Sequence, residues 1–243
     1  MGQALRNPLA QGFYTVPEAA RLIQVGNARR IYGWLRGYTG RDIGPLLNRD
    51  YKPIGEDEEL SFHDLMEVRF VEHFREAGVK ARSLRIAAER LRRELDTKHP
   101  FASQRVMLTA DKADVFVKEI LKKAAEEADD VRLRSLTTNN YVMYEAIKQA
   151  LIPGVEFSPA TELVNRWTPM PDKFPTIIID PRIARGQPTI PKGIPTVALF
   201  DAWKAENKSV DSVAFWYNIP STDVLSAVKF EQALDKDYQR RAA

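Results

Sequence analysis

The residues best suited to chemistry in this sequence are arginines grouped between positions 29 and 36. Arg29, Arg30 and Arg36 share one side of this segment with Tyr32 and Gly33, at helical spacing. A guanidinium is a planar fork of donors that bonds a phosphate or a guanine edge through two hydrogen bonds. A glycine lets the backbone approach a ligand closely. The pattern indicates a surface for nucleic acid, or alternatively an ordinary amphipathic helix with a solvated arginine face.

Residue types for other chemistry are scarce or badly spaced. The chain of 243 residues has no cysteine, which excludes disulfides, thiol nucleophiles and thiolate zinc sites. His63 and His73 are ten residues apart on one expected helix, which separates them by about 15 Å along its axis. They cannot share a metal. Three aspartates, at 180, 201 and 211, are well separated, and Asp180 is expected to cap a turn. We expect no catalytic residue, no metal site and no cofactor, and therefore no enzyme.

The elements that must position the arginines begin with a capping box. Thr15 and Glu18, with Pro17 between them, predict the start of a short helix. Residues 24–26 predict a tight turn, and Asn27 is an N-cap candidate for a second helix that reaches about Gly37. The apolar side of this second helix is expected to hold Ala28, Ile31, Trp34, Leu35 and Tyr38.

Two further helices are expected after a loop. Residues 39–55 are rich in Gly, Pro and Asn and precede an acidic run at 56–59, so a small hairpin is expected there. Ser61 with Asp64 predicts a helix that ends at Gly78. Residues 79–95 predict another, whose buried stripe would hold Leu84, Ala87 or Ala88, Leu91 and Leu95 and whose polar surface is rich in arginine.

The charge is unevenly distributed. There are 36 basic and 33 acidic side chains, a net charge of +3, and the whole excess precedes Pro100. Residues 1–50 contain seven arginines and three acidic residues, residues 51–78 contain three basic and eight acidic residues, and residues 79–100 contain seven basic and three acidic residues. Two basic segments therefore flank an acidic one.

The order helix, turn, helix, wing-like loop, helix and helix over about residues 14–95 resembles the winged helix-turn-helix of MerR-type regulators. The stretch from Tyr14 to Ala20 is similar to the family's opening, and Arg30 and Tyr32 are similar to its recognition-helix residues. The resemblance implies DNA binding through Arg29, Arg30, Tyr32, Gly33 and Arg36. The chain departs from the family in a longer turn, and in Glu58 where the family has a wing arginine.

The middle of the chain predicts a small α+β region. Residues 106–109 and 115–117 predict two strands joined by a hairpin turn, although residues 119–127 carry a nearly equal helical signal. A helix is expected over 139–151, short strands over 154–157 and 163–167, and a proline-rich linker over 169–175. This region could bind a ligand, dimerise or only connect its neighbours.

The C-terminal part predicts a buried strand at 177–179, a proline- and glycine-rich arm, and three helices over 197–206, 209–217 and 222–234. Thr196, Ser209 and Ser221 are the cap candidates, and Asn218 is expected in a left-handed turn. Ala214, Ile219, Val224 and Ala227 stand where a helix-turn-helix needs packing residues.

Residues 175–235 resemble the C-terminal domain of VapB-type antitoxins, domain-of-unknown-function family 433, which are encoded beside PIN-like ribonuclease toxins. The motif residues are Asp180, Pro181, Gly186, Pro188, Gly193 and Thr196. In the arm, residues 192–196 read Lys-Gly-Ile-Pro-Thr in place of the more usual Gly-Thr-Arg-Ile. The bundle could serve in dimerisation, in toxin contact or in reading bases.

The sequence thus predicts a mainly α protein with a small α+β middle region. The expected domains are a MerR-like winged helix-turn-helix at 10–98, a middle region at 99–174 and a helical antitoxin-type domain at 175–236. The expected function is a cytoplasmic, homodimeric antitoxin that binds double-stranded operator DNA, represses its own operon and neutralises a PIN-like ribonuclease toxin. No targeting segment and no apolar run of membrane-spanning length is present, so no membrane partner is expected. The alternatives are a stand-alone regulator that senses a small molecule through its middle region, and an adaptor that does not bind DNA.

Overall fold

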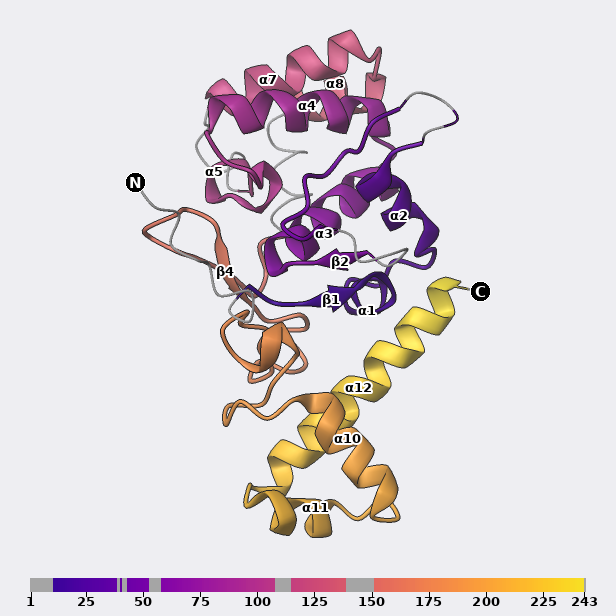
Figure 1. The fold of residues 1–243 in the computed structure, drawn as a ribbon, viewed down its shortest axis with the longest axis vertical. Coiled ribbons are helices and arrows are strands. Elements are labelled where there is room, and N and C mark those ends of the chain that lie inside the picture. Colours follow the sequence, from indigo (N-terminus) through magenta and orange to yellow (C-terminus); the bar gives the residue numbers. More distant parts are fainter. Residues whose placement is uncertain are drawn as a thin grey trace.

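The structure is a computed structural model that describes residues 11–38, 40, 43–52, 58–107, 115–138 and 151–242. In these residues the fold is mainly helical with two small antiparallel sheets, which confirms the expected fold class. Figure 1 shows helices α4, α7 and α8 stacked at one end, the first sheet and helices α1–α3 in the middle, and α10–α12 at the other end.

The N-terminal part follows the predicted order of elements, and the signals that start its helices are local. Thr15 and Glu18 form the predicted capping box, and Ser61 and Asp64 form the second. In the sheet, Tyr14 lies opposite Leu60. The elements are β1 (Tyr14–Thr15), α1 (Val16–Leu22), α2 (Arg29–Arg36), β2 (Glu59–Leu60), α3 (Phe62–Glu76) and α4 (Ala81–Glu94).

The hairpin predicted at residues 106–117 is wrong in the part that the structure describes. Instead, residues Gln104–Met107 form helix α5 and residues Val115–Glu127 form α7, which packs against α4 and against α8 (Val131–Thr138). Ser103 accepts a hydrogen bond from the backbone N–H of Val106 and so starts α5. Further along α7, the apolar stripe of Ile120, Leu121, Ala124, Ala125 and Ala128 is buried.

The second sheet lies where the sequence predicted strands, with β3 (Val155–Phe157) antiparallel to β4 (Val164–Trp167). The predicted buried strand at 177–179 forms only isolated bridges among the described residues, from Ile179 to Trp167 of β4 and from Ile178 to Thr189 of the arm. The proline-rich stretch is packed rather than free, since Phe174 makes an edge-to-face contact with Phe230 of the last helix. The helix predicted over 139–151 lies almost wholly outside the described residues, apart from residue 151 in a turn.

Three helices close the chain: α10 (Thr196–Ala205), α11 (Val210–Tyr217) and α12 (Ser221–Ala242). Ser209 caps α11, and Asn218 adopts the predicted left-handed conformation after it. The other two cap predictions are wrong. Thr196 is the first residue of α10 and donates its hydroxyl to the carboxylate of Glu231, while the Ser221 hydroxyl donates to Asp211 over 2.9 Å. The last helix extends beyond the predicted end at 234 and runs back toward α1 (Figure 1).

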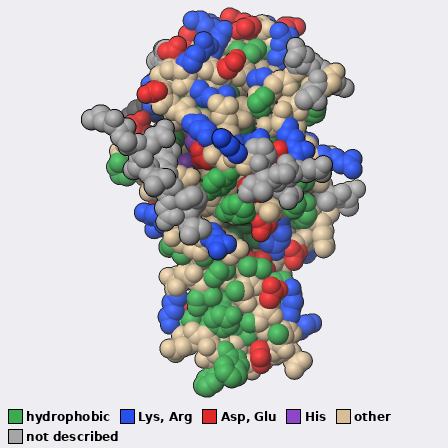
Figure 2. Space-filling model, in the orientation of Figure 1, with side chains coloured by type: hydrophobic (Ala, Val, Ile, Leu, Met, Phe, Trp, Pro, Cys, Tyr) green, Lys and Arg blue, Asp and Glu red, His purple; other side chains and the backbone are tan. Residues whose placement is uncertain are grey.

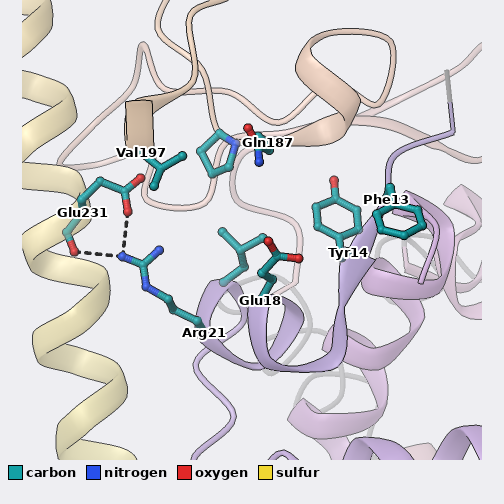
Figure 3. A pocket seen from close by; sticks show the side chains of 9 residues that line it. Phe13, Tyr14, Glu18, Arg21, Gln187, Val197 and Glu231 are labelled. Carbon is teal, nitrogen blue, oxygen red and sulfur yellow. Dashed lines mark hydrogen bonds and ion pairs between the residues drawn. The ribbon is translucent and has the colours of Figure 1, made fainter. Parts of the chain in front are cut away.

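Helices α1 and α12 are joined by ion pairs. The guanidinium of Arg21 lies 2.7 Å from the carboxylate of Glu231 and 2.8 Å from that of Asp235. A pocket of about 280 Å³ opens beside this contact (Figure 3). It is lined by Phe13, Tyr14, Glu18, Arg21, Leu22, Gln187, Pro188, Val197 and Glu231. Its three charged side chains have partners within the protein. Arg21 donates a hydrogen bond to Glu231, and Glu18 accepts one from the backbone N–H of Thr15.

The buried core forms two clusters. The larger runs from Tyr14 in β1 to Leu234 in α12 and includes both sides of the α1–α12 contact. The smaller holds Ile190 together with residues of α10–α12 and of the turn between α11 and α12, among them the predicted packing residues Ala214, Ile219, Val224 and Ala227. Across the described ranges, every helix is too short or too polar to cross a bilayer.

Candidate nucleic-acid interface

Helix α2 presents its first residue, Arg29, to solvent. Gln24 takes a left-handed conformation in the turn before it, and the Asn27 side chain accepts a hydrogen bond from the Arg29 N–H over 3.0 Å. The N-cap residue of α2 is Ala28, so Asn27 caps the helix from the position before it. Within the part of the chain that the structure describes, Arg29 forms no ion pair, so its guanidinium is available to an outside anion.

Arg30 forms an ion pair within the protein. Its guanidinium lies 2.9 Å from the carboxylate of Glu72 on α3 and 5.6 Å from the ring centre of Trp34. Burial raises the pKa of Glu72 above its ordinary value, and the nearby Arg30 partly opposes this. Arg30 nevertheless keeps 37% of its side chain exposed, so a phosphate could compete with Glu72 for it.

Arg36 is likewise paired, with the carboxylate of Glu58, and Arg49 pairs with the same carboxylate. Glu58 is only 4% exposed, although the acidic run to which it belongs suggested a surface position. The guanidinium of Arg36 also stacks on the half-buried ring of Tyr32, 5.1 Å from its centre. Tyr32 packs against the core below, and Arg36 covers it.

The burial of two residues, one in α2 and one just after its C-terminal end, is the reverse of the prediction. Gly33 is buried rather than exposed, and a Cβ there would come within 2.2 Å of the Tyr38 hydroxyl. Tyr38, predicted in the core, is 47% exposed and covers Gly33. The helix ends at Arg36, so helical spacing no longer determines where residue 38 points. Ile31, Trp34 and Leu35 are buried as predicted.

The segment after α2 is held by two arginines of α4 that sequence reasoning placed only on a polar surface. Arg85 donates to the carbonyl of Gly44 over 3.1 Å, and Arg92 donates to the carbonyl of Leu46 over 2.6 Å. Burial lowers the pKa of both guanidinium groups below their ordinary value. The basic stretch at 79–100 thus serves partly to fix the loop beside α2, while Arg82 and Arg93 remain exposed.

Comparison with solved structures finds a similar fold. The chain is similar to Rv2018 from Mycobacterium tuberculosis, whose crystal structure aligns with a TM-score of 0.62 and 21% sequence identity. The alignment covers 88% of this chain and 96% of that one. No protein-family model matches the sequence, and no curated protein matches it. At this identity the likeness concerns the fold alone.

The C-terminal motif residues are structural in their contacts. Asp180 is buried and accepts hydrogen bonds from the backbone and the guanidinium of Arg182, as its predicted turn-capping role requires. Arg182 outweighs burial and lowers the pKa of Asp180. The carbonyl of Gly186 accepts a hydrogen bond of 2.6 Å from the Tyr14 hydroxyl, so the arm is fastened to the first strand.

The other motif residues shape the arm and its attachment to the helices. Gly193 has a φ of +75°, a conformation that favours glycine. The carbonyl of Pro188 accepts a hydrogen bond from the N–H of Thr196 over 2.9 Å. Pro181 follows Asp180 in its turn. The motif therefore brings the arm against β1 at one end and against α10 at the other.

Proposed function

We propose that this protein binds double-stranded operator DNA through the exposed face of α2. The supporting observation is that Arg29, at the exposed start of the helix, forms no ion pair among the described residues. The next arginines of the helix, Arg30 and Arg36, are each more than a third exposed. A helix that enters the major groove makes its base contacts mainly through its N-terminal residues. Phosphates would compete with Glu72 and Glu58 for the two paired arginines.

We further propose that the protein is an antitoxin that represses its own operon and neutralises a PIN-like ribonuclease toxin. This rests on the C-terminal resemblance, and one structural feature supports a protein partner. Helix α11 carries an exposed aromatic face formed by Phe215, Trp216 and Tyr217, of which the first two are 79% and 70% exposed. Figure 2 shows hydrophobic side chains gathered toward this end of the molecule. Exposed apolar patches of this kind mark interaction surfaces.

A homodimer is part of the proposal, because paired half-sites one or two helical turns apart need two copies of α2. The protein would then bind DNA through α2 in the middle of the molecule and the toxin through α11 at one end (Figure 1). Helix α2 packs into the larger core cluster and α11 into the smaller one, so Arg29 and the aromatic face of α11 can be altered separately.

The test uses the full chain and its own operon. Fluorescence anisotropy with a labelled duplex from the upstream region should show salt-dependent binding that an unlabelled upstream duplex, and not a scrambled one, competes away. Co-expression with the neighbouring gene, followed by purification through a tag on this chain, should recover a complex. Absence of specific binding by the wild type would overturn the operator proposal, and absence of a complex would overturn the antitoxin proposal.

The pocket beside Arg21 supports a second candidate function, a regulator that senses a small molecule. The lining of the pocket comes from β1, α1 and the C-terminal part and includes no residue of 99–174, the region in which sequence reasoning placed the ligand. Its volume of about 280 Å³ lies at the lower edge of the usual range for ligand sites. A gene for an enzyme or transporter beside this one, in place of a small acidic toxin, would favour this candidate.

A further inference from the structure

A cluster of ionisable side chains includes one residue of the loop that follows α2. Asp50 comes from that loop, His63 from the first turn of α3, and His99 from the segment after α4. Each offers one ligand atom, and the three atoms lie within 4.8 Å of one another. The two imidazole rings are 5.4 Å apart between centres. The cluster is independent of the residues proposed for DNA binding.

Hydrogen bonds orient both rings. The Nε2 atom of His99 lies 3.0 Å from an oxygen of Asp50, and its Nδ1 lies 3.3 Å from an oxygen of the fully buried Glu67. The Nε2 atom of His63 lies 3.0 Å from the carbonyl oxygen of Val164. A carboxylate or carbonyl on one ring nitrogen is the usual support for a histidine that binds a metal through the other, because it fixes the tautomer and the ring plane.

The cluster also contains several buried carboxylates. Three carboxylates, those of Asp50, Asp64 and Glu67, lie within 3.6 Å of the His99 ring nitrogens. The amine of Lys98 lies 2.9 Å from Asp50, and the guanidinium groups of Arg49 and Arg92 interact electrostatically with Asp64 and Glu67. Asp64 is fully buried, and its Oδ1 atom has no hydrogen-bond partner among the described residues. A buried carboxylate oxygen that lacks a donor calls for a further cation nearby.

We propose that Asp50, His63 and His99 bind a divalent transition-metal ion such as Zn²⁺, and that Glu67 orients the His99 ring. Two imidazoles and one carboxylate form a donor set that suits Zn²⁺, Fe²⁺ and Co²⁺ and does not suit Mg²⁺ or Ca²⁺. Ligand bonds of about 2.0–2.2 Å place neighbouring donor atoms roughly 3.0–3.5 Å apart. The separation of 3.0 Å between Asp50 Oδ2 and His99 Nε2 fits this spacing. The ion would join the loop after α2 to the start of α3 and to the segment after α4.

Without a metal, a proton on His99 supplies part of the missing positive charge. Burial opposes that charge, but the hydrogen bonds from the ring to Asp50 and Glu67 prevail and raise the pKa of His99 to about 10. Metal and proton therefore compete for the same nitrogen, and the experiment must distinguish a metal site from a site that binds only a proton.

The experiment uses the full chain after dialysis against a chelator. Titration with Zn²⁺ in a calorimeter should show one equivalent bound, and titration with Co²⁺ should give visible absorption bands that report nitrogen and oxygen ligands in a site of low coordination number. Each of the variants His63→Gln, His99→Gln and Asp50→Asn should lose the absorption and at least about tenfold in affinity. Glu67→Gln, which alters a positioning residue, should weaken binding by about 10- to 100-fold while one equivalent still binds.

His73→Gln is the matched control, because His73 lies on the same helix as His63 and outside the cluster. It should bind Zn²⁺ as the wild type does. Since His99→Gln could unfold the chain, each variant is also checked by circular dichroism, and His63→Gln, which alters a half-buried ring, provides the informative variant if His99→Gln unfolds. Failure of the wild type to bind Zn²⁺ or Co²⁺, or equal binding by wild type and folded His63→Gln, would overturn the proposal. The result is independent of whether the protein binds DNA.

Discussion

The guanidinium of Arg36 is paired with the buried carboxylate of Glu58, which Arg49 also contacts. Glu58 therefore holds a predicted DNA-binding arginine against the protein. Replacement of this carboxylate by an amide, Glu58→Gln, removes the charge that competes with a phosphate. We expect tighter DNA binding and a slope of log affinity against log salt that is steeper by roughly 0.9 for each arginine released.

Anisotropy titrations at several salt concentrations measure both quantities. Glu76→Gln is the control, because Glu76 pairs with Arg241 at an exposed position and should leave the affinity unchanged. Weaker binding by Glu58→Gln than by the wild type, with the fold intact, would contradict the idea that Glu58 competes with DNA.

Arg29 gives the complementary prediction. Because it is exposed and forms no ion pair within the described ranges, Arg29→Ala should leave the free energy of unfolding within about 0.5 kcal/mol of the wild type. Its DNA affinity should fall, by about 1–3 kcal/mol if Arg29 reaches a base edge, or with a salt slope shallower by roughly 0.9 if it contacts a phosphate. Arg240→Ala, at the exposed end of α12, is the matched control. Unchanged DNA affinity in Arg29→Ala would show that Arg29 does not contact the DNA.

The sequence predicted those features that depend on neighbours along the chain. The capping boxes at Thr15 and Ser61 and the left-handed turn at Asn218 are each set by a few adjacent residues, and all three are confirmed. The strand prediction at 115–117 is wrong because these three residues favour strands by themselves, whereas the residues that follow have the apolar spacing of a helix that begins at Val115. A longer window would have identified the helix.

Contacts between distant residues could not be predicted. The sequence contains the acid of Glu58 and the base of Arg36, but only the fold shows that they are paired and that Gly33 lies under Tyr38. The cluster of Asp50, His63 and His99 could not be predicted for the same reason, since its residues come from three separate segments that only the fold brings together. The sequence therefore predicted the helix α2 correctly, but not the ion pairs that Arg30 and Arg36 form.

Gly186 provides a test of how the C-terminal arm is fastened. Its φ is +80°, and a Cβ at this position would come within 2.3 Å of the Tyr14 hydroxyl. Gly186→Ala should therefore disrupt the hydrogen bond from Tyr14 to the Gly186 carbonyl and lower the free energy of unfolding by about 1–3 kcal/mol. Urea titration measures the change. Gly40→Ala is the control, because a Cβ there meets no described atom within 4 Å, and an equal loss in both variants would argue against this specific contact.

Asp130 should make stability depend on pH. Its carboxylate accepts hydrogen bonds from the backbone N–H groups of Lys80 and Leu133 and from the Ser83 hydroxyl, which joins α4 to α8. Burial alone would raise the pKa of Asp130, but these hydrogen bonds prevail and lower it. The stabilisation is present above the unfolded-state pKa of about 3.9 and is lost as the pH falls through the lower folded-state value.

Urea unfolding from pH 7 to pH 3 measures this effect. Asp130→Asn should be less stable than the wild type by about 1–3 kcal/mol at pH 7, and the difference should shrink below about pH 4. A difference that stays constant over this range would show that the charge of Asp130 does not contribute.

The aromatic face of α11 gives a prediction for the proposed partner. Phe215 and Trp216 are exposed and contact each other, with ring centres 5.8 Å apart, while Val213 and Ala214 of the same helix are buried. Trp216→Ala should therefore leave the thermal unfolding midpoint unchanged or slightly higher, since it removes exposed apolar surface without opening a cavity. Loss of a buried aromatic anchor from an interface costs about 2 kcal/mol or more, so the affinity for the neighbouring gene product should fall at least about 30-fold. Val197→Ala, a change at an exposed position on α10, is the control. If Trp216→Ala remains folded and recovers the partner as well as the wild type does, the partner binds elsewhere. That result would leave the proposal of DNA binding through α2 unchanged.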